Sequence, residues 1–265
     1  MITIPEIDTV RSAYRAATPY PYVVIDNFLP VALAERLAAT FPAFDDMATI
    51  FREPMSYKGQ TSDIANKAPA FKMIFDDLQS EAFRQQIGYI TGIDKLLDDA
   101  ILAGGGLHQS PNSGFLDIHV DANYHPIDKS LHRRINLLIY LNKDWQEAWG
   151  GQFEIWTNRN HKPDQRAYVI SPTFNRAVIF GTTRISWHGV GPIHCPPGQA
   201  RKSLALYYYT KERPAEEMYA DSSVIWHNRT VLWKRTVYPV MNFCIARLKP
   251  YAKYLRRNVF DAANK

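Results

Sequence analysis

Leu116-Asp117-Ile118-His119-Val120-Asp121 is the stretch on which the predicted fold of this chain depends. Its apolar residues alternate with polar ones, which is typical of a half-buried β-strand. Side chains two positions apart in a strand lie on the same face, so His119 and Asp121 are expected to project together. An imidazole nitrogen and a carboxylate oxygen on one face can bind a divalent metal at two points. His-x-Asp alone is a weak signal, because any alternating strand can carry it by chance.

A second histidine follows in Ser186-Trp187-His188-Gly189-Val190, another strand-like segment with an aromatic neighbour. Two histidines and one carboxylate on the same side of a metal form the facial triad of non-haem Fe(II) oxygenases. Such a triad leaves the remaining coordination positions open for substrates. His119, Asp121 and His188 are therefore the candidate metal ligands and catalytic residues.

A candidate carboxylate site lies further along, in the β-rich run at residues 198–209. Arg201 and Ser203 are two positions apart, so a guanidinium and a hydroxyl share a face. Arginine binds carboxylates through two parallel hydrogen bonds, which makes this pair a fork for such a group. Lys202 is a competing cation, but it is expected on the opposite face of the strand.

From about residue 104 to residue 210, these motifs resemble the Fe(II)/2-oxoglutarate-dependent dioxygenases, particularly the prolyl-4-hydroxylase-like branch. Two further segments carry the resemblance, at residues 139–145 and 150–156. The resemblance implies Fe(II), 2-oxoglutarate as cosubstrate and O2, with Arg201 and Ser203 holding the distal carboxylate of 2-oxoglutarate. The tyrosine that matches Tyr140 in the hypoxia-sensing prolyl hydroxylases binds the same carboxylate, although Tyr140 could equally be a core residue.

The other histidines match no motif and are interpreted as non-ligands. His125 and His194 could still face the pocket, since each lies near a triad residue in the sequence. Asn136 and Leu138 share a strand face with Tyr140 and could line the same pocket. Relatives that halogenate carry a small residue at the position of Asp121, so the resemblance favours hydroxylation or desaturation here.

The predicted fold is mainly β with flanking α: a double-stranded β-helix of the jelly-roll or cupin-like kind. Strands are expected at residues 20–28, 134–140, 152–156, 166–170 and 176–180, besides those that carry the motifs. Helical apolar spacing appears at residues 30–42, 71–78 and 83–92, and the polar stretch at residues 45–69 is expected to be a long loop over the active site. We predict a single catalytic domain over residues 1–265. It comprises an N-terminal strand and support helices (1–103), the β-helix core (104–212) and a basic, helical C-terminal extension (213–265).

The composition is ordinary for a globular protein, with 46% hydrophobic and 22% charged residues among 265. Two cysteines provide no disulfide framework or metal-type spacing, which favours a reducing compartment. No signal peptide or membrane-spanning run is visible, so a cytoplasmic location is expected. We expect no nucleic-acid partner, and the sequence sets no oligomeric state.

The net charge of +5 is unevenly distributed. Residues 222–260 contain eight basic and no acidic side chains, which leaves −3 for the rest of the chain. The end at residues 249–257 could make a weak contact with an anionic membrane or attract an acidic substrate. The alternative is a solvated helix end that balances the charge of the remaining chain.

Two functions fit these observations. The first is an Fe(II)- and 2-oxoglutarate-dependent hydroxylase that oxidises a C–H bond while 2-oxoglutarate is decarboxylated to succinate. Its substrate could be a small molecule or a peptidyl prolyl residue, and a small molecule is favoured because no peptide-docking module is evident. The second is a non-catalytic cupin-like protein that binds a metal or a ligand, which would have no need of the Arg201-x-Ser203 pair.

Overall fold

The structure is a computed structural model that describes residues 2–218 and 224–227. Met1–His227 form one compact unit and Asn228–Lys265 a second. Most of the predicted C-terminal extension, including the basic end at residues 249–257, lies outside the described residues. The predicted division of the chain into domains stays a prediction.

Helices are concentrated in the first hundred residues, where the sequence predicts support helices. The α-helices are α1 (Ile7–Ala16), α2 (Val31–Ala39), α3 (Ile64–Lys67), α4 (Lys72–Gln79) and α5 (Glu81–Thr91). Short 3-10 helices are η1 (Phe44–Asp46), η2 (Pro69–Phe71), η3 (Glu147–Trp149) and η4 (Ala215–Glu217).

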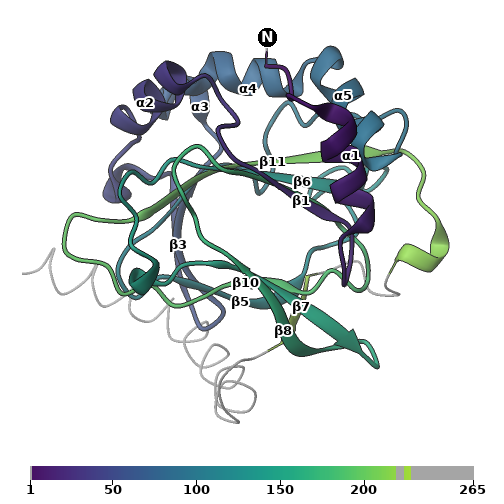
Figure 1. The fold of residues 1–265 in the computed structure, drawn as a ribbon. Coiled ribbons are helices and arrows are strands. Elements are labelled where there is room, and N and C mark those ends of the chain that lie inside the picture. The colour runs from purple at the N-terminus through teal and green to yellow at the C-terminus, as the bar shows by residue number, and fades with distance from the viewer. Residues whose placement is uncertain (1, 219–223, 228–265) are drawn as a thin grey trace, which may run out of the picture. The chain divides into compact units, whose positions relative to one another are not determined.

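The strands form one continuous antiparallel sheet. They are β1 (Tyr22–Ile25), β2 (Thr49–Glu53), β3 (Ser56–Thr61), β4 (Gly106–Ser110), β5 (Phe115–Val120), β6 (His132–Tyr140), β7 (Phe153–Arg159), β8 (Lys162–Ile170), β9 (Ala177–Gly181), β10 (His188–Val190), β11 (Arg201–Thr210) and β12 (Ile225–His227). Their order is β1-β9-β6-β11-β4-β3-β5-β10-β7-β8, with β2 paired to β3 and β12 paired to β5. Figure 1 shows how this sheet folds over into two facing layers, with β1, β6 and β11 in one and β5, β10, β7 and β8 in the other.

The helices cover the outer face of the first layer (Figure 1). Alternation along β6 turns Ile135, Leu137 and Ile139 toward the helices, where they join the largest apolar cluster. Asn136 and Tyr140 on the same strand are left facing the opposite layer. One strand thus supplies both a hydrophobic support and an inward row of functional groups.

Helix α5 illustrates how the supports are defined locally. The hydroxyl of Ser80 caps its first turn by accepting the backbone N–H of Phe83, and Gly92 ends the helix with φ at 75°. Phe83, Ile87 and Ile90 recur at helical spacing and are fully buried against the sheet.

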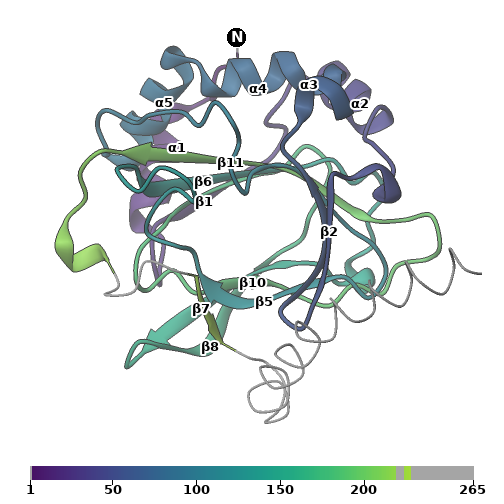
Figure 2. The same cartoon turned by 180° about the vertical axis from the view of Figure 1, so that it is seen from behind.

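The predicted loop at residues 45–69 is wrong. Most of this segment is a hairpin, β2 and β3, followed by the short helix α3. Strand β3 pairs with β4 through Gly59–Thr61 and with β5 through Ser56 and Tyr57, so it closes one side between the two layers. Figure 1 labels β3 at this side, and Figure 2 labels its partner β2 there. The hairpin was missed because its inward side chains line a polar cavity, which removes the apolar alternation that marks a strand.

The predicted fold class is confirmed: the described residues form a mainly antiparallel double-stranded β-helix supported by N-terminal helices. Within the part of the chain that is described, no helix combines the length and apolar character that crossing a membrane requires.

Candidate active site

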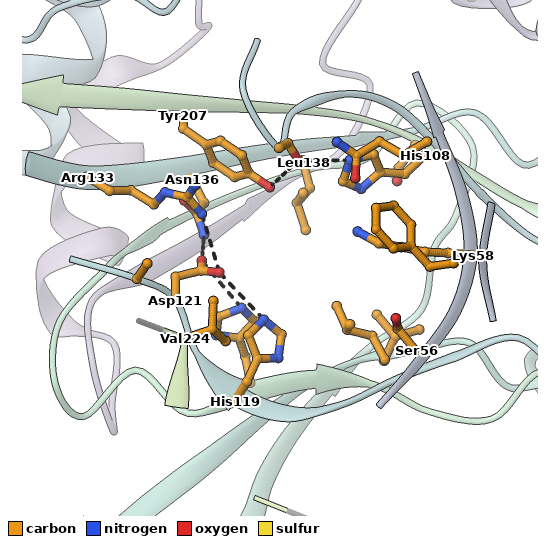
Figure 3. Close-up of a pocket in the computed structure, with 18 of the residues that line it drawn as sticks. Ser56, Lys58, His108, His119, Asp121, Arg133, Asn136, Leu138, Tyr207 and Val224 are labelled. Carbon is orange, nitrogen blue, oxygen red and sulfur yellow. Dashed lines mark hydrogen bonds and ion pairs between the residues drawn. The ribbon is translucent and has the colours of Figure 1, made fainter. Parts of the chain in front are cut away.

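A cavity of about 540 Å³ lies between the two layers of the sheet. Its walls combine side chains from β5, β10 and β7 on one side with side chains from β6, β11, β4 and β3 on the other. This volume is in the range of small-molecule binding sites in enzymes. Figure 3 shows the polar groups that point into it.

The three predicted metal ligands meet on one wall of this cavity. His119 is on β5, Asp121 directly follows β5, and His188 begins the neighbouring strand β10. His119 and His188 are paired across the two strands, and the ligand atoms of all three residues lie within 4.8 Å of one another. The His119 Nε2 is 3.5 Å from the Asp121 Oδ1, and the His188 Nε2 is 3.7 Å from the Asp121 Oδ2. Ligands that share one divalent ion at about 2.1 Å lie roughly 3–4 Å apart, so the arrangement fits such an ion.

Backbone hydrogen bonds hold both histidines in the tautomer that leaves the Nε2 atom available to a metal. The Nδ1–H of His119 donates to the carbonyl of Asp117 at 2.8 Å, and the Nδ1–H of His188 donates to the carbonyl of Ser186 at 2.8 Å. Because a carbonyl only accepts, each Nδ1 carries the proton and each Nε2 presents its lone pair toward Asp121. Burial, followed by the neighbouring His119, lowers the pKa of His188 to about 4, which keeps it neutral.

Asp121 is fixed by two inward-facing residues of β6. The Asn136 amide donates to the Asp121 Oδ2 at 2.5 Å, and the Arg133 Nη1 is 3.4 Å from the Asp121 Oδ1. Burial alone would raise the pKa of Asp121, but the Arg133 guanidinium is the largest opposing influence, and the pKa is held well below its usual range. The carboxylate is therefore ionised and oriented.

A bulge in β5 modifies the predicted alternation. His188 pairs with His119, but Val190 pairs with Leu116, so three steps on β5 match two on β10. As a result Leu116 lines the cavity together with His119, while Ile118 and Val120 pack in a separate cluster with Trp187. Leu116 therefore departs from the regular alternation of the stretch, whereas His119 and Asp121 project together as expected.

Arg201 lines the same cavity, and it contacts Tyr140, which is fully buried beside it. The Arg201 Nε donates to the Gly151 carbonyl at 2.9 Å, and its Nη2 donates to the Tyr140 hydroxyl at 3.2 Å. Gly151 has a φ of 71°, and a Cβ there would lie 3.3 Å from the Arg201 Cδ. Burial raises the pKa of Tyr140, partly opposed by Arg201, so its phenol stays protonated and can donate to a carboxylate.

The other predicted carboxylate ligand is also on this wall. Ser203 is buried, lines the cavity and pairs across the sheet with both Tyr140 and His108. Lys202 points away from the cavity, with its ammonium 5.6 Å from the ring centre of Phe41. The structure thus separates Arg201 from its neighbour as strand alternation predicts.

Several cavity residues were not foreseen, and two predicted possibilities are excluded. Lys58, Arg133 and Trp226 line the cavity but belong to no motif. The Trp226 ring lies 4.8 Å from that of His119, because β12 adds beside β5. His125 instead pairs with buried Asp99 at 3.3 Å and His194 is exposed, and neither lines the cavity. Only tertiary pairing brings Lys58 and Trp226 to the site, so no local sequence signal could have identified them.

Comparison with known proteins finds a family that matches the part of the chain that contains this site. Residues 105–209 match the family described as the 2OG-Fe(II) oxygenase superfamily. This segment, which we call the matched domain, makes up 105 of the 265 residues. The superfamily implies Fe(II), 2-oxoglutarate and O2, and the domain contains a matching cluster of two histidines and one carboxylate. The predicted resemblance to the prolyl-4-hydroxylase-like branch is confirmed by the relatives described next.

The chain is similar to prolyl 3-hydroxylase OGFOD1 of Mus musculus, with 25% identity over 196 residues that cover 72% of this chain and 33% of that protein. The chain thus matches about a third of the length of this relative. Its fold is similar to that of a prolyl-4-hydroxylase from Pseudomonas putida, with a TM-score of 0.51, 19% identity, and coverage of 76% of this chain and 98% of that one. It is also similar to a Trichoplax adhaerens prolyl hydroxylase solved with a hypoxia inducible factor peptide fragment, with a TM-score of 0.52, 18% identity, and coverage of 77% and 90%.

Proposed function

We propose that this chain is an Fe(II)- and 2-oxoglutarate-dependent dioxygenase that hydroxylates a C–H bond of an organic substrate. His119, Asp121 and His188 would bind the metal, while Arg201, Tyr140 and Ser203 would bind the distal carboxylate of 2-oxoglutarate. When bound, the metal and the cosubstrate supply the oxidising chemistry, with 2-oxoglutarate decarboxylated to succinate. The remaining tasks fall to the protein.

The observation that carries the proposal is the orientation of the two histidines. Backbone carbonyls accept both Nδ1–H groups, so both Nε2 lone pairs point toward the ionised carboxylate of Asp121. Arg133 and Asn136 hold that carboxylate from behind, which limits its motion before a metal binds. This is the arrangement expected of a prearranged metal site.

A non-catalytic metal-binding protein is the alternative, and the far wall of the cavity argues against it. Arg201, buried and held by Gly151 and Tyr140, faces the same cavity as the histidines. A purely structural metal has no need of a buried guanidinium, whereas a dicarboxylate cosubstrate does.

The substrate itself is either a small molecule or a peptidyl residue. The sequence argument favours a small molecule, whereas the similarity to proteins named prolyl hydroxylases supports a prolyl peptide. Both classes belong in a substrate screen. The candidate metal ligands line the cavity, so the reacting group of either kind of substrate must enter the cavity to reach them.

The test is succinate formation from 2-oxoglutarate by the purified chain with Fe(II) in air, followed by NMR, with and without each candidate substrate. We expect slow succinate release without substrate, faster release with a true substrate, and none when a chelator removes the metal. Tight binding of metal and 2-oxoglutarate without succinate release under any condition would favour the binding-protein alternative.

A further inference from the structure

The cavity carries more positive charge than the metal site and the cosubstrate explain. Among the described residues, its lining includes four cationic side chains, Lys58, Lys129, Arg133 and Arg201, and two acidic ones, Glu53 and Asp121. An Fe(II) ion and the dianion of 2-oxoglutarate cancel each other in formal charge. An excess of two positive charges therefore remains after both have bound.

Three of these cations have partners. Arg133 pairs with Asp121 at 3.4 Å, and Arg201 is held by Gly151 and Tyr140. Lys129 donates to the carbonyls of His125 and Pro126 at 3.1 and 2.9 Å.

Lys58 differs from the other three. Its ammonium makes no hydrogen bond or ion pair with any residue that the structure describes, and it lies over the Phe51 ring, whose centre is 5.6 Å away. Lys58 is half-buried, and a cation that is partly withdrawn from water without a counter-charge gains free energy when an anion binds.

The position of Lys58 directs this charge into the site. It lies at the middle of β3, between the segment that pairs with β4 and the segment that pairs with β5. Figure 3 shows its side chain extending into the cavity from β3, across from Asp121 and His119. Ser56 and Gln60, two positions away on either side, also line the cavity, so this face of β3 is polar throughout.

The electrostatic environment of Lys58 favours the binding of an anion. Burial, only partly opposed by Asp121, lowers the pKa of Lys58 to about 8, so the amine is mainly charged at neutral pH. The neighbouring His108 has a pKa well below its usual range, chiefly because it is buried and secondarily because of Lys58. His108 is therefore neutral, and Lys58 is the cation on this wall that an incoming anion would meet.

We propose that Lys58 binds an oxyanion of the prime substrate, and that this substrate is a small organic acid with a carboxylate or phosphate group. The inference rests on the proposed function, because it assumes that Arg201 is occupied by 2-oxoglutarate. A small acid is favoured over an acidic protein because Lys58 lines the same cavity of about 540 Å³ as the metal ligands, and this volume suits a small molecule. The substrate would span from Lys58 to the metal site, with the C–H bond to be hydroxylated at the metal end.

The experiment uses the full chain loaded with Zn(II) and 2-oxoglutarate, so that the metal and cosubstrate sites are filled without turnover. Acetate and inorganic phosphate are titrated separately at neutral pH, and their dissociation constants are measured by calorimetry for the wild type, Lys58→Met, Lys58→Arg and Lys202→Met. Lys202→Met is the matched control, since Lys202 is a nearby lysine on the outer face of the sheet.

We expect Lys58→Met to weaken binding of the preferred anion at least tenfold, Lys58→Arg to retain it within about threefold, and Lys202→Met to match the wild type. Tighter acetate binding would assign a carboxylate, and tighter phosphate binding a phosphoryl group. Equal binding by Lys58→Met and the wild type, or no binding of either anion by the wild type, would overturn the proposal.

Two further measurements separate this proposal from the proposed function. The affinity for 2-oxoglutarate is measured in the same samples, and a loss of that affinity in Lys58→Met would assign Lys58 to the cosubstrate and overturn the proposal. Fe(II)-dependent succinate release by the wild type is measured independently. Absence of that release would refute the oxygenase activity, whereas the anion titrations judge Lys58 alone.

Discussion

Replacing Arg201 with glutamine is expected to weaken 2-oxoglutarate binding while leaving the metal site in place. The guanidinium is anchored on one side by the Gly151 carbonyl and on the other by the Tyr140 hydroxyl, so its direction is set before the cosubstrate arrives. Glutamine removes the charge and the fork but keeps a polar group of moderate length. The metal ligands belong to β5, Asp121 just beyond it, and β10, none of which contains Arg201.

The magnitude follows from the environment of the pair. Truncating one partner of a buried, hydrogen-bonded charge pair costs roughly 2–5 kcal/mol. The lower part of this range applies here, because Tyr140 and Ser203 remain on the same wall and the cavity is large enough to admit water. A loss of about 2–3 kcal/mol corresponds to 2-oxoglutarate binding about 30- to 150-fold more weakly.

The assay is calorimetric titration of 2-oxoglutarate into Zn(II)-loaded wild type, Arg201→Gln and Lys202→Met, with the Zn(II) content of each protein determined beforehand. The KM for 2-oxoglutarate in Fe(II)-dependent succinate release provides a second measure, which should rise in parallel. Unchanged affinity in Arg201→Gln would refute the assignment of the carboxylate clamp. A loss confined to Lys202→Met would transfer the clamp to the neighbouring lysine.

Four further outcomes are expected. Asp121→Ala should abolish Fe(II)-dependent succinate release and weaken Zn(II) binding at least a hundredfold, as measured by competition with a chelator. This substitution also leaves buried Arg133 without its carboxylate partner, so the melting temperature should fall. The melting temperature of Asp121→Asn should fall less. Titration of Co(II) should quench part of the tryptophan fluorescence, because the Trp226 ring lies 4.8 Å from that of His119. This part of the quenching should be missing in Trp226→Phe, and equal quenching in both proteins would contradict the placement of β12. In urea unfolding, Gly198→Ala should lose roughly 1–2 kcal/mol of stability from left-handed backbone strain alone, because a Cβ there meets nothing within 4 Å. Gly150→Ala should lose well beyond this amount, because a Cβ at Gly150 would lie 2.1 Å from the Pro192 carbonyl oxygen. Acetate binding should weaken as pH rises above about 8, where Lys58 loses its proton, and Lys58→Met, which lacks this ammonium, should show no such dependence between pH 7 and pH 9.

The parts of the fold that alternation encodes could be predicted from the sequence. In β6, Ile135, Leu137 and Ile139 face the helices, whereas Asn136 and Leu138 line the cavity, and this alternation follows from the strand pattern in the sequence. The helices α4 and α5 were equally visible, because their buried residues recur at helical spacing. Both patterns arise from burial against one large neighbouring surface.

Where burial does not select apolar residues, the sequence carries no comparable pattern. Strand β3 faces a polar cavity with Ser56, Lys58 and Gln60, so it was interpreted as a loop. The bulge that turns Leu116 into the cavity depends on pairing between β5 and β10, which are far apart in the chain. The contact of Arg133 with Asp121 likewise comes from packing of separate strands, so its partner could not be named from local sequence.

The same division separates the cofactor chemistry from recognition of the substrate. The candidate metal ligands and Arg201 all lie within residues 105–209, the segment that matches the oxygenase family. Lys58 and Trp226 lie outside that segment, yet β3 and β12 place both in the same cavity by pairing with β5. In this arrangement, one set of strands carries the candidate ligands of the metal and the cosubstrate. Substitutions in the flanking strands can therefore change the shape and charge around the substrate without changing those ligands. The sequence motifs therefore identify the reaction class readily, whereas the substrate must be inferred from the side chains that the flanking strands contribute.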